Sequence, residues 1–247
     1  MLKCSSKSAT VPKIGNSVDE NEDNILEPSV LEIESINLLR FAISDGATES
    51  SFSKEWSDLL VSFYKDKSFE KEHILDTLKL VSDTWRSITN NSDLPWYAQQ
   101  KAEIGSFAAF LGLTINRDEH VYNSVAVGDC TLFHIRDDKL IFAFPIKTFD
   151  EFGNTPNLIA SNIKYQTKLA ETVAYSNGDI QSNDVIILAT DALAAWIFKQ
   201  KDMDEKPWNH LADILENKIR LETWLNSERQ ANEIKNDDIA IIFIKLE

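Results

Sequence analysis

The stretch Leu39–Ser50, LRFAISDGATES, decides the fold and the chemistry that we expect of this chain. Its apolar run Phe41–Ile43 predicts a buried β-strand, and this strand ends at Asp45-Gly46. A buried strand with a carboxylate at its tip, followed by a glycine that lets the backbone turn, can present a metal ligand. Most Asp-Gly pairs, however, are ordinary turns. The role of Asp45 therefore depends on whether other parts of the chain supply carboxylates in the same context.

The composition is acidic, with 40 acidic and 25 basic residues in a chain of 247. This balance disfavours binding to nucleic acid or to an anionic membrane, because both carry negative charge. It allows a cation-binding centre, since carboxylates cluster most readily around a divalent ion. The two cysteines, Cys4 and Cys130, provide no paired framework, and no apolar run has membrane-spanning length. We therefore expect a cytoplasmic protein with no nucleic-acid and no membrane partner.

Hydrophobic periodicity predicts groups of strands that alternate with groups of helices. Strands are expected at Ile25–Val30, Ser35–Asp45, Gly105–Ile115, Asn123–Asp129, Cys130–Ile135, Leu140–Phe144, Asp184–Thr190 and Ile239–Leu246. Helices are expected at Phe52–Lys65, Lys71–Ile88, Ala192–Lys199, Trp208–Ile219 and Leu221–Ile234, with a further short helix before Lys101. The strands between Gly105 and Phe144 indicate an antiparallel meander. Because no internal repeat or low-complexity linker divides the chain, we expect residues 1–247 to form a single domain.

Two segments have weaker patterns. The polar N-terminus predicts either disorder over residues 1–14 or a short edge strand. Residues 145–183 contain several turn-forming residues and predict a flap-like insertion. Long irregular segments of compact domains frequently act as lids over functional sites, and an ordinary peripheral insertion is the alternative.

Four further aspartates share the context of Asp45, which is a strand end or turn beside apolar sheet residues. The full set is Asp23, Asp45, Asp129, Asp191 and Asp237. If the strands pack together, these carboxylates converge, and a buried cluster of like charges is costly unless a cation compensates it. Oxygen ligands without histidine or cysteine favour hard ions such as Mg²⁺ or Mn²⁺. The alternative is that all five are ordinary structural turns.

The motifs that carry these aspartates resemble, in their order and strand context, the metal-dependent protein phosphatases of the protein phosphatase 2C family. They are NED at Asn21–Asp23, SDG at Ser44–Gly46, VGDC at Val127–Cys130, LATDAL at Leu188–Leu193 and DDIAII at Asp237–Ile242. The resemblance extends from about Gly15 to the C-terminus, and FAISDGATES and LATDALAAW look like a bacterial-type branch of the family. It implies an α+β fold, namely a four-layer α/β/β/α sandwich of two antiparallel sheets flanked by helices.

The resemblance also implies a role for each residue of the motifs. Asp45 would bridge two metal ions, and the carbonyl group of Gly46 would bind the second of them. Asp191 and Asp237 would hold the first ion. Asp23 would act directly or through metal-bound water, with Glu22 beside it in the outer shell. In the family's Gly-Asp-Ser position, which reads Gly-Asp-Cys here, Asp129 would serve a weaker third ion together with Asp191.

The implied function is hydrolysis of phosphoserine or phosphothreonine on proteins by a water that bridges two Mn²⁺ or Mg²⁺ ions. Asp45 and Asp23 would be the catalytic residues. A phosphorylated protein would be the substrate, and a cognate Ser/Thr kinase would be a further partner. No histidine is needed as a nucleophile, so we expect the four histidines at surfaces or strand edges: His73, His120, His134 and His210.

The sequence departs from the family at the residues that handle phosphate. The family carries a phosphate-binding arginine four residues before the glutamate of its first motif, and here that position is Val18. Its loss should weaken substrate affinity, because arginine binds phosphate with two parallel hydrogen bonds. Lys13 or Arg40 could replace it, or each could be a plain surface charge. The stretch Ala47–Ser50 stands where the family tends to carry glycines.

Three functions therefore remain open from the sequence. The first is an active phosphatase, and the intact set of aspartates favours it. The second is a non-catalytic relative that binds a partner or a phosphorylated ligand, which Val18 favours. The third is an acidic structural protein that binds no metal.

Overall fold

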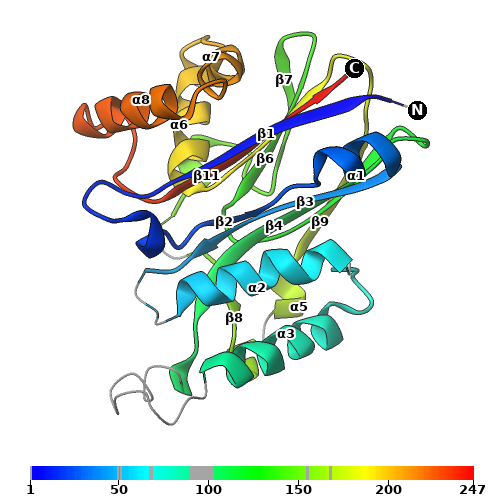
Figure 1. The fold of residues 1–247 in the computed structure, drawn as a ribbon, viewed down its shortest axis with the longest axis vertical. Coiled ribbons are helices and arrows are strands. Elements are labelled where there is room, and N and C mark those ends of the chain that lie inside the picture. Colours follow the sequence, from blue (N-terminus) through cyan, green and yellow to red (C-terminus); the bar gives the residue numbers. More distant parts are fainter. Residues whose placement is uncertain are drawn as a thin grey trace.

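The structure is a computed structural model that describes residues 2–48, 50, 52–66, 69–89, 103–153, 156–166 and 169–247. Within these residues the strands form two sheets, and every pair of neighbouring strands is antiparallel (Figure 1). The five-stranded sheet has the order β1 (Cys4–Val11), β11 (Ile239–Leu246), β10 (Val185–Ala189), β6 (Thr131–Arg136) and β7 (Lys139–Phe144). The six-stranded sheet has the order β2 (Asn24–Leu26), β3 (Leu38–Gly46), β4 (Phe107–Asn116), β5 (Val121–Val127) and β9 (Ala174–Asp179), with β8 (Ile159–Ala160) also paired to β4.

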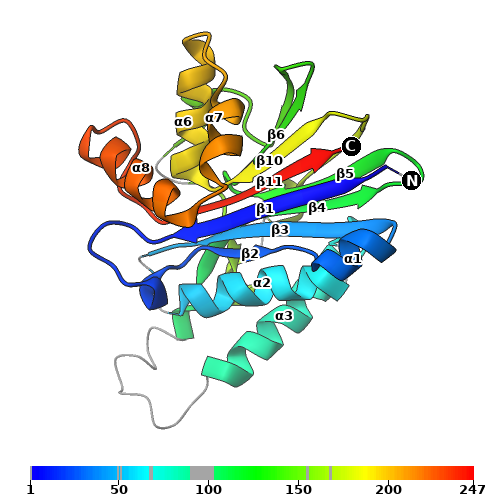
Figure 2. The same cartoon turned by 45° about the horizontal axis from the view of Figure 1, so that its top comes forward.

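Helices cover the outer face of each sheet, which gives the predicted four layers (Figure 2). The six-stranded sheet is covered by α2 (Ser53–Asp66) and α3 (Ile74–Thr89), and the five-stranded sheet by α6 (Asp191–Asp202), α7 (Pro207–Ile214) and α8 (Lys218–Gln230). The shorter elements are α1 (Val30–Ser35), α5 (Leu169–Thr172) and the 3₁₀ turns η1 (Val18–Glu20), η2 (Phe149–Glu151) and η3 (Ile163–Tyr165). The α+β sandwich expected from the sequence is therefore confirmed.

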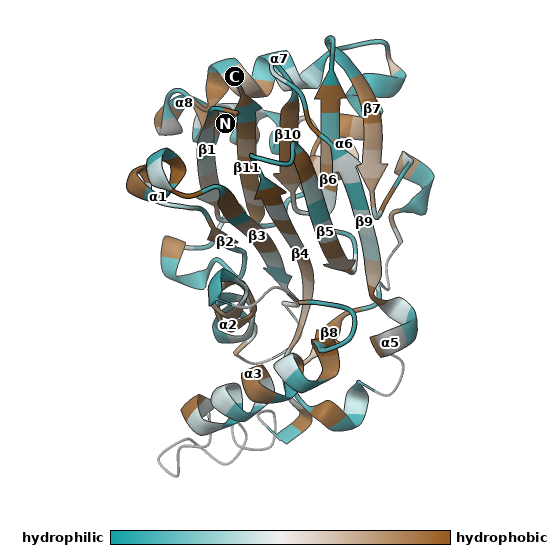
Figure 3. Cartoon of the chain, turned by 90° about the vertical axis from the view of Figure 1, so that its right-hand side faces the viewer, coloured by the Kyte–Doolittle hydropathy of each residue, from teal (hydrophilic) through white to brown (hydrophobic). Residues whose placement is uncertain are grey.

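The apolar run in β3 is continuous because the strand is buried on both of its faces. Phe41 and Ile43 pack between the two sheets, whereas Ala42 packs beneath α2 and α3. Figure 3 shows the same pattern as brown central strands, among them β3, β4, β10 and β11. A strand that is covered on both sides has no polar face, so its sequence lacks the alternation of a half-exposed strand.

Two of the sequence predictions for strands are wrong in part. The meander expected between Gly105 and Phe144 is divided, because β5 belongs to the six-stranded sheet and β6 to the five-stranded one. The strand expected at Ile25–Val30 stops at Leu26. Ser29 then caps α1 in a capping box, in which its side chain accepts a hydrogen bond from the backbone N–H of Glu32.

The weakly patterned segments contain sheet strands. Of the two predictions for the N-terminus, the structure shows the edge strand, β1. The flap prediction for residues 145–183 is wrong for β9, which pairs with β5 along its whole length. The side chains of β9 are alternately half-buried and exposed. Its sequence, AYSNGD, is polar and therefore lacks the apolar pattern that predicts a strand. The short helix predicted before Lys101 falls on residues outside the described ranges. Among the described residues, no helix is both long and apolar enough to cross a bilayer.

A buried ion-pair network joins β6 to the turn before β10. The carboxylate of Asp184 accepts hydrogen bonds from Arg136 at 2.7 and 2.9 Å and from the backbone N–H of Gln181 at 2.8 Å. The Nε2 atom of His134 lies 2.9 Å from the same carboxylate. Burial alone would raise the pKa of Asp184, but the hydrogen bonds from Arg136 and His134 outweigh it and hold the pKa below its usual range.

This network corrects one prediction about the histidines. His134 is 2% exposed and lies in the core, not at a surface. The other three histidines are exposed, as expected.

We predict that Asp184→Ala lowers the free energy of unfolding by about 3 kcal/mol, because it leaves Arg136 and His134 without their buried partner. Asp179 offers a matched control, since it also contacts Arg136, at 3.0 Å, but has a side chain that is 71% exposed. Asp179→Ala should cost less than about 1 kcal/mol. Urea denaturation of both variants checks this, and a loss below about 1 kcal/mol for Asp184→Ala would contradict the prediction.

Candidate metal centre

The NED motif lies against the tip of β3 because of a close backbone contact. Strand β2 pairs Asn24 with Ser44, and continuing this antiparallel register by one residue places Asp23 opposite Asp45. The backbone N–H of Gly46 donates a hydrogen bond to the carbonyl oxygen of Glu22 at 3.3 Å. A Cβ atom on Gly46 would lie only 3.0 Å from that same oxygen. Gly46 therefore permits the approach that brings the first two motifs together.

A second glycine brings Asp129 to the same place. Gly128 has a φ of +96°, and a Cβ atom there would lie 2.6 Å from the Cβ atom of Ala109. Ala109 is the residue that pairs with Asp45 across β3 and β4. Asp129 is the next residue after Gly128, and its negative charge raises the pKa of Asp45.

The five-stranded sheet supplies the remaining two aspartates from neighbouring strands. Asp191 is the first residue of α6 and comes directly after β10, and its Oδ1 atom accepts a hydrogen bond from the N–H of Ala192 at 2.6 Å. The helix N-terminus favours a negative charge at this point. Asp237 precedes β11, and β10 and β11 are paired. The structure thus brings all five predicted aspartates close to one another, beside the end of β3. Figure 2 shows this end of the sandwich, from which the chain continues towards α2.

Two residues that the sequence analysis did not single out hold the surrounding loops. Asp238 is 4% exposed, and its carboxylate accepts hydrogen bonds from the backbone N–H groups of Lys13 at 2.8 Å and Glu22 at 3.0 Å. Arg229 is also buried and donates to the carbonyl oxygens of Pro12 at 3.0 Å and Asp237 at 2.6 Å. No local pattern could have found these contacts, because the partners of Asp238 lie more than 200 residues away in the sequence.

The electrostatics of the cluster point to a missing positive charge. Asp23 is buried, and neither of its carboxylate oxygens has a hydrogen-bond partner among the described residues. The nearby hydroxyl of Thr190 is engaged with the backbone of Ala240. Burial raises the pKa of Asp23 and of Asp45 well above the usual range, and the neighbouring carboxylates raise both further. The Thr190 hydroxyl beside Asp23 lowers the pKa of that carboxyl, but it does not outweigh the burial.

The pKa values of Asp129 and Asp191 are raised as well. For both residues burial is the main cause, and it brings the pKa of Asp129 to about 6. The charge of Asp191 adds to the shift of Asp129, and Asp237 adds to both shifts. Burial and mutual repulsion therefore make the negative charge on Asp23, Asp45, Asp129 and Asp191 unfavourable, and a nearby cation would offset this cost.

Lys235 is a cation that contacts this cluster, and its position was not predicted from the sequence. Its Nζ atom lies 2.6 Å from Oδ2 of Asp237 and 3.4 Å from Oδ2 of Asp191. Partial burial lowers the pKa of Lys235, but the hydrogen bond to Asp237 and the charge of Asp191 outweigh it and raise the pKa above its usual range. The lysine is therefore fully charged at neutral pH.

The two basic residues that could replace the family's arginine, Lys13 and Arg40, differ in their position relative to the aspartate cluster. Val18, in η1, is 65% exposed and carries no charge. Lys13 lies next to the cluster, with its Nζ atom 3.1 Å from Oγ1 of Thr48 and 3.6 Å from a carboxylate oxygen of Glu22. Arg40 instead donates to the carbonyl oxygen of Lys65 at the end of α2. Lys13 is thus the better placed of the two.

The cluster fits a hard divalent ion by the chemistry of its donors, which are carboxylate oxygens, two of them without hydrogen bonds. In the part of the chain that the structure describes, no three acidic, histidine or cysteine side chains already converge on one metal position. Binding would therefore need adjustment of side chains. Cys130 offers no alternative nucleophile, because burial raises the pKa of its thiol well above the usual range.

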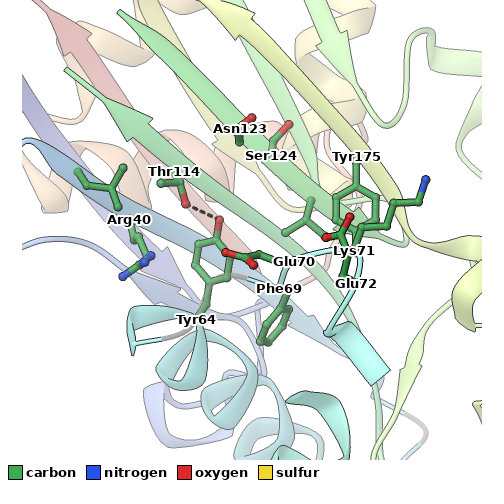
Figure 4. A pocket seen from close by; sticks show the side chains of 12 residues that line it. Arg40, Tyr64, Phe69, Glu70, Lys71, Glu72, Thr114, Asn123, Ser124 and Tyr175 are labelled. Carbon is green, nitrogen blue, oxygen red and sulfur yellow. Dashed lines mark hydrogen bonds between the residues drawn. The ribbon is translucent and has the colours of Figure 1, made fainter. Parts of the chain in front are cut away.

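A separate cavity of about 380 Å³ opens on the outer face of the six-stranded sheet (Figure 4). Tyr64 and Thr114 line it and share a hydrogen bond of 2.9 Å. None of the five aspartates lines it, and Arg40 in its wall belongs to the half of β3 that is remote from Asp45. This cavity is therefore distinct from the candidate metal centre.

Comparison with solved structures places the fold among phosphatases. The photosystem II phosphatase PBCP aligns with a TM-score of 0.62, 15% identity and 99% coverage of both chains. The catalytic domain of the serine threonine protein phosphatase PstP, in complex with two manganese ions, aligns with a TM-score of 0.54 and 11% identity over 100% of this chain and 99% of that one. RsbX in complex with magnesium aligns with a TM-score of 0.55 and 13% identity over the whole of both chains.

At these identities the likeness shows the fold, and the chain has the fold of the protein phosphatase 2C-type phosphatases. The sequence itself matches no protein-family model and no curated protein.

We predict that Asp129 makes the metal-free fold less stable as the pH rises. Because folding raises the pKa of Asp129 from 3.8 to about 6, the folded state binds more protons than the unfolded state between these values, and stability falls across that window. In EDTA, Asp129→Asn should therefore gain stability relative to the wild type, by about 2 kcal/mol, between pH 4 and pH 7. Urea unfolding at both values checks this. The exposed Asp118→Asn is the control, and a pH-independent difference for Asp129→Asn would contradict the prediction.

Proposed function

We propose that this protein belongs to the protein phosphatase 2C family, in its bacterial-type branch, and hydrolyses phosphoserine or phosphothreonine on proteins with two Mn²⁺ or Mg²⁺ ions. The carrying observation is that five aspartates from both halves of the sandwich lie close enough to affect one another's pKa, and that neither oxygen of the buried Asp23 has a hydrogen-bond partner among the described residues. The fold adds support, because similar structures include phosphatases, and two of these structures contain magnesium or manganese. The proposal includes a cytoplasmic location and a Ser/Thr kinase that produces the substrate.

The strand ends suggest how the residues divide the work. Asp45, at the tip of β3, would bridge the two ions, and the carbonyl group of Gly46 would contact the second. Asp191 and Asp237, from the other sheet, would hold the first ion. Asp23 would act on the metal directly or through metal-bound water, with Glu22 beside it in the outer shell. The backbone carbonyl of Glu22 accepts a hydrogen bond from Ser57 at 2.6 Å. Asp129 would serve a weaker third ion together with Asp191.

When bound, the ions would supply an activated water and neutralise the phosphate oxygens. The residues of the chain would provide the geometry. Asp45 and Asp23 would hold the reacting groups in line, and Lys13 would attract the phosphate in place of the missing arginine. No covalent intermediate is needed, which agrees with the buried, protonated thiol of Cys130.

The second candidate is a regulatory relative that binds a phosphorylated ligand or partner without hydrolysing it. Two observations favour it: Val18 is an exposed apolar residue where the family has its arginine, and Lys235 contacts the carboxylates proposed to hold the first ion. A third possibility, an acidic protein without metal, predicts that Mn²⁺ leaves the melting temperature unchanged, whereas binding to the folded state raises it.

We predict that the protein hydrolyses p-nitrophenyl phosphate and a phosphothreonine peptide in the presence of Mn²⁺. Asp45→Asn should lower kcat at least about a hundredfold, because an amide is a poor bridging ligand for two divalent ions. Asp118→Asn makes the same chemical change at an exposed turn and should keep full activity. Background rates for the wild type and Asp45→Asn alike, together with a Mn²⁺-dependent rise in melting temperature, would favour the regulatory relative.

We also predict that Lys13→Met raises the KM for a phosphopeptide about tenfold and changes kcat less than about threefold, since a lysine outside the ligand set contributes mainly to binding. Lys7→Met removes the same charge from an ion pair with Glu216 and should leave KM unchanged. Steady-state kinetics of the two variants separate these cases. If the KM values of both variants equal that of the wild type, Lys13 has no role in phosphate binding.

A further inference from the structure

Lys235 contacts the cluster from a loop that is held on both sides. The loop lies between α8 and β11. Ile234, before the lysine, is 2% exposed in the core under α6 and α7. Asn236, after it, pairs with the backbone of Ile14 through hydrogen bonds of 2.8 and 3.3 Å. The backbone of Lys235 is therefore fixed beside the carboxylates, and its position is not that of a free surface lysine.

The side chain of Lys235 is anchored much less than its backbone. It is 67% exposed, and among the described residues its ammonium group contacts Asp237 at 2.6 Å and Asp191 at 3.4 Å. Both are carboxylates that the proposed function assigns to the first metal ion. An exposed lysine can move its ammonium group into water at small cost, because the group is strongly hydrated there and its stem is flexible.

We propose that Lys235 is a tethered competitor of the metal: its ammonium group and a divalent cation bind the same pair of carboxylates, Asp191 and Asp237, and one must leave when the other binds. Lys235 thereby sets the metal affinity of the site. This inference rests on the proposed function, because it takes these two aspartates as metal ligands.

Elementary electrostatics gives the direction of the effect. A lysine within 4 Å of two carboxylates removes part of the negative charge that attracts a divalent ion, and it repels that ion directly. Metal binding must therefore displace the ammonium group, which weakens the apparent affinity. The same lysine stabilises the metal-free protein, since it offsets the repulsion between the two carboxylates.

The test is a Mn²⁺ titration of the full chain by isothermal calorimetry, with thermal unfolding in EDTA as a second readout. Lys235→Met and Lys235→Gln should raise Mn²⁺ affinity about tenfold or more, because both remove the competing charge. Both should also lower the melting temperature in EDTA. Lys235→Arg keeps the charge and should stay within about threefold of the wild-type affinity.

Lys199→Met is the matched control, because it removes the same positive charge from a neighbouring ion pair. Lys199 pairs with Glu233, and Glu233 lies two residues before Lys235 in the sequence. Its Mn²⁺ affinity should stay within about twofold of the wild type, since an exposed pair is well screened. Unchanged affinity in Lys235→Met and Lys235→Gln would overturn the inference while leaving the metal centre intact. An equal gain in Lys199→Met would overturn it as a general charge effect. If neither the wild type nor Lys235→Met binds Mn²⁺, the result contradicts the proposed metal centre itself and not only the role of Lys235.

Discussion

Repulsion among the carboxylates at one end of the sandwich is the constraint around which the surrounding structure is arranged. Asp23 and Asp45 are brought together by the pairing of β2 with β3, and Asp191 and Asp237 come from the opposite sheet. Burial of like charges costs free energy unless hydrogen bonds or a cation compensate them. Lys235, the N-terminus of α6 and the Thr190 hydroxyl compensate part of this charge. Among the described residues, the oxygens of Asp23 have no hydrogen-bond partner.

Asp184 shows that a buried carboxylate elsewhere in this fold has a full set of hydrogen bonds. Asp184 is as buried as Asp23, yet its two oxygens accept hydrogen bonds from Arg136 and a backbone N–H, and its pKa is lowered, not raised. The same sandwich thus contains one buried acid whose oxygens are hydrogen-bonded and another, Asp23, whose oxygens have no hydrogen-bond partner among the described residues. Natural proteins tolerate such local conflicts mainly at functional sites.

The sequence predicted the parts of the structure that depend on local pattern. The apolar run of β3 and the glycine after Asp45 were sufficient to place the tip of that strand, and the helical spacing of α2 and α3 gave their bounds within a few residues. The division between β5 and β6 was not predictable, because a crossing between sheets at Gly128 looks like any tight turn. Lys235 was missed because it lies in a turn that any polar residue could occupy, and its partner Asp191 is distant in sequence. Asp238 was missed because its partner Glu22 is also distant in sequence.

The most direct measurement of the metal centre is anomalous diffraction from crystals of the wild-type protein grown with Mn²⁺. We expect two strong peaks on either side of the Asp45 carboxylate, one next to Asp191 and Asp237 and the other next to the carbonyl of Gly46. The ammonium group of Lys235 should have moved away from the aspartates. Peaks confined to other acidic surfaces, or no peak with Lys235 still paired to Asp237, would contradict it.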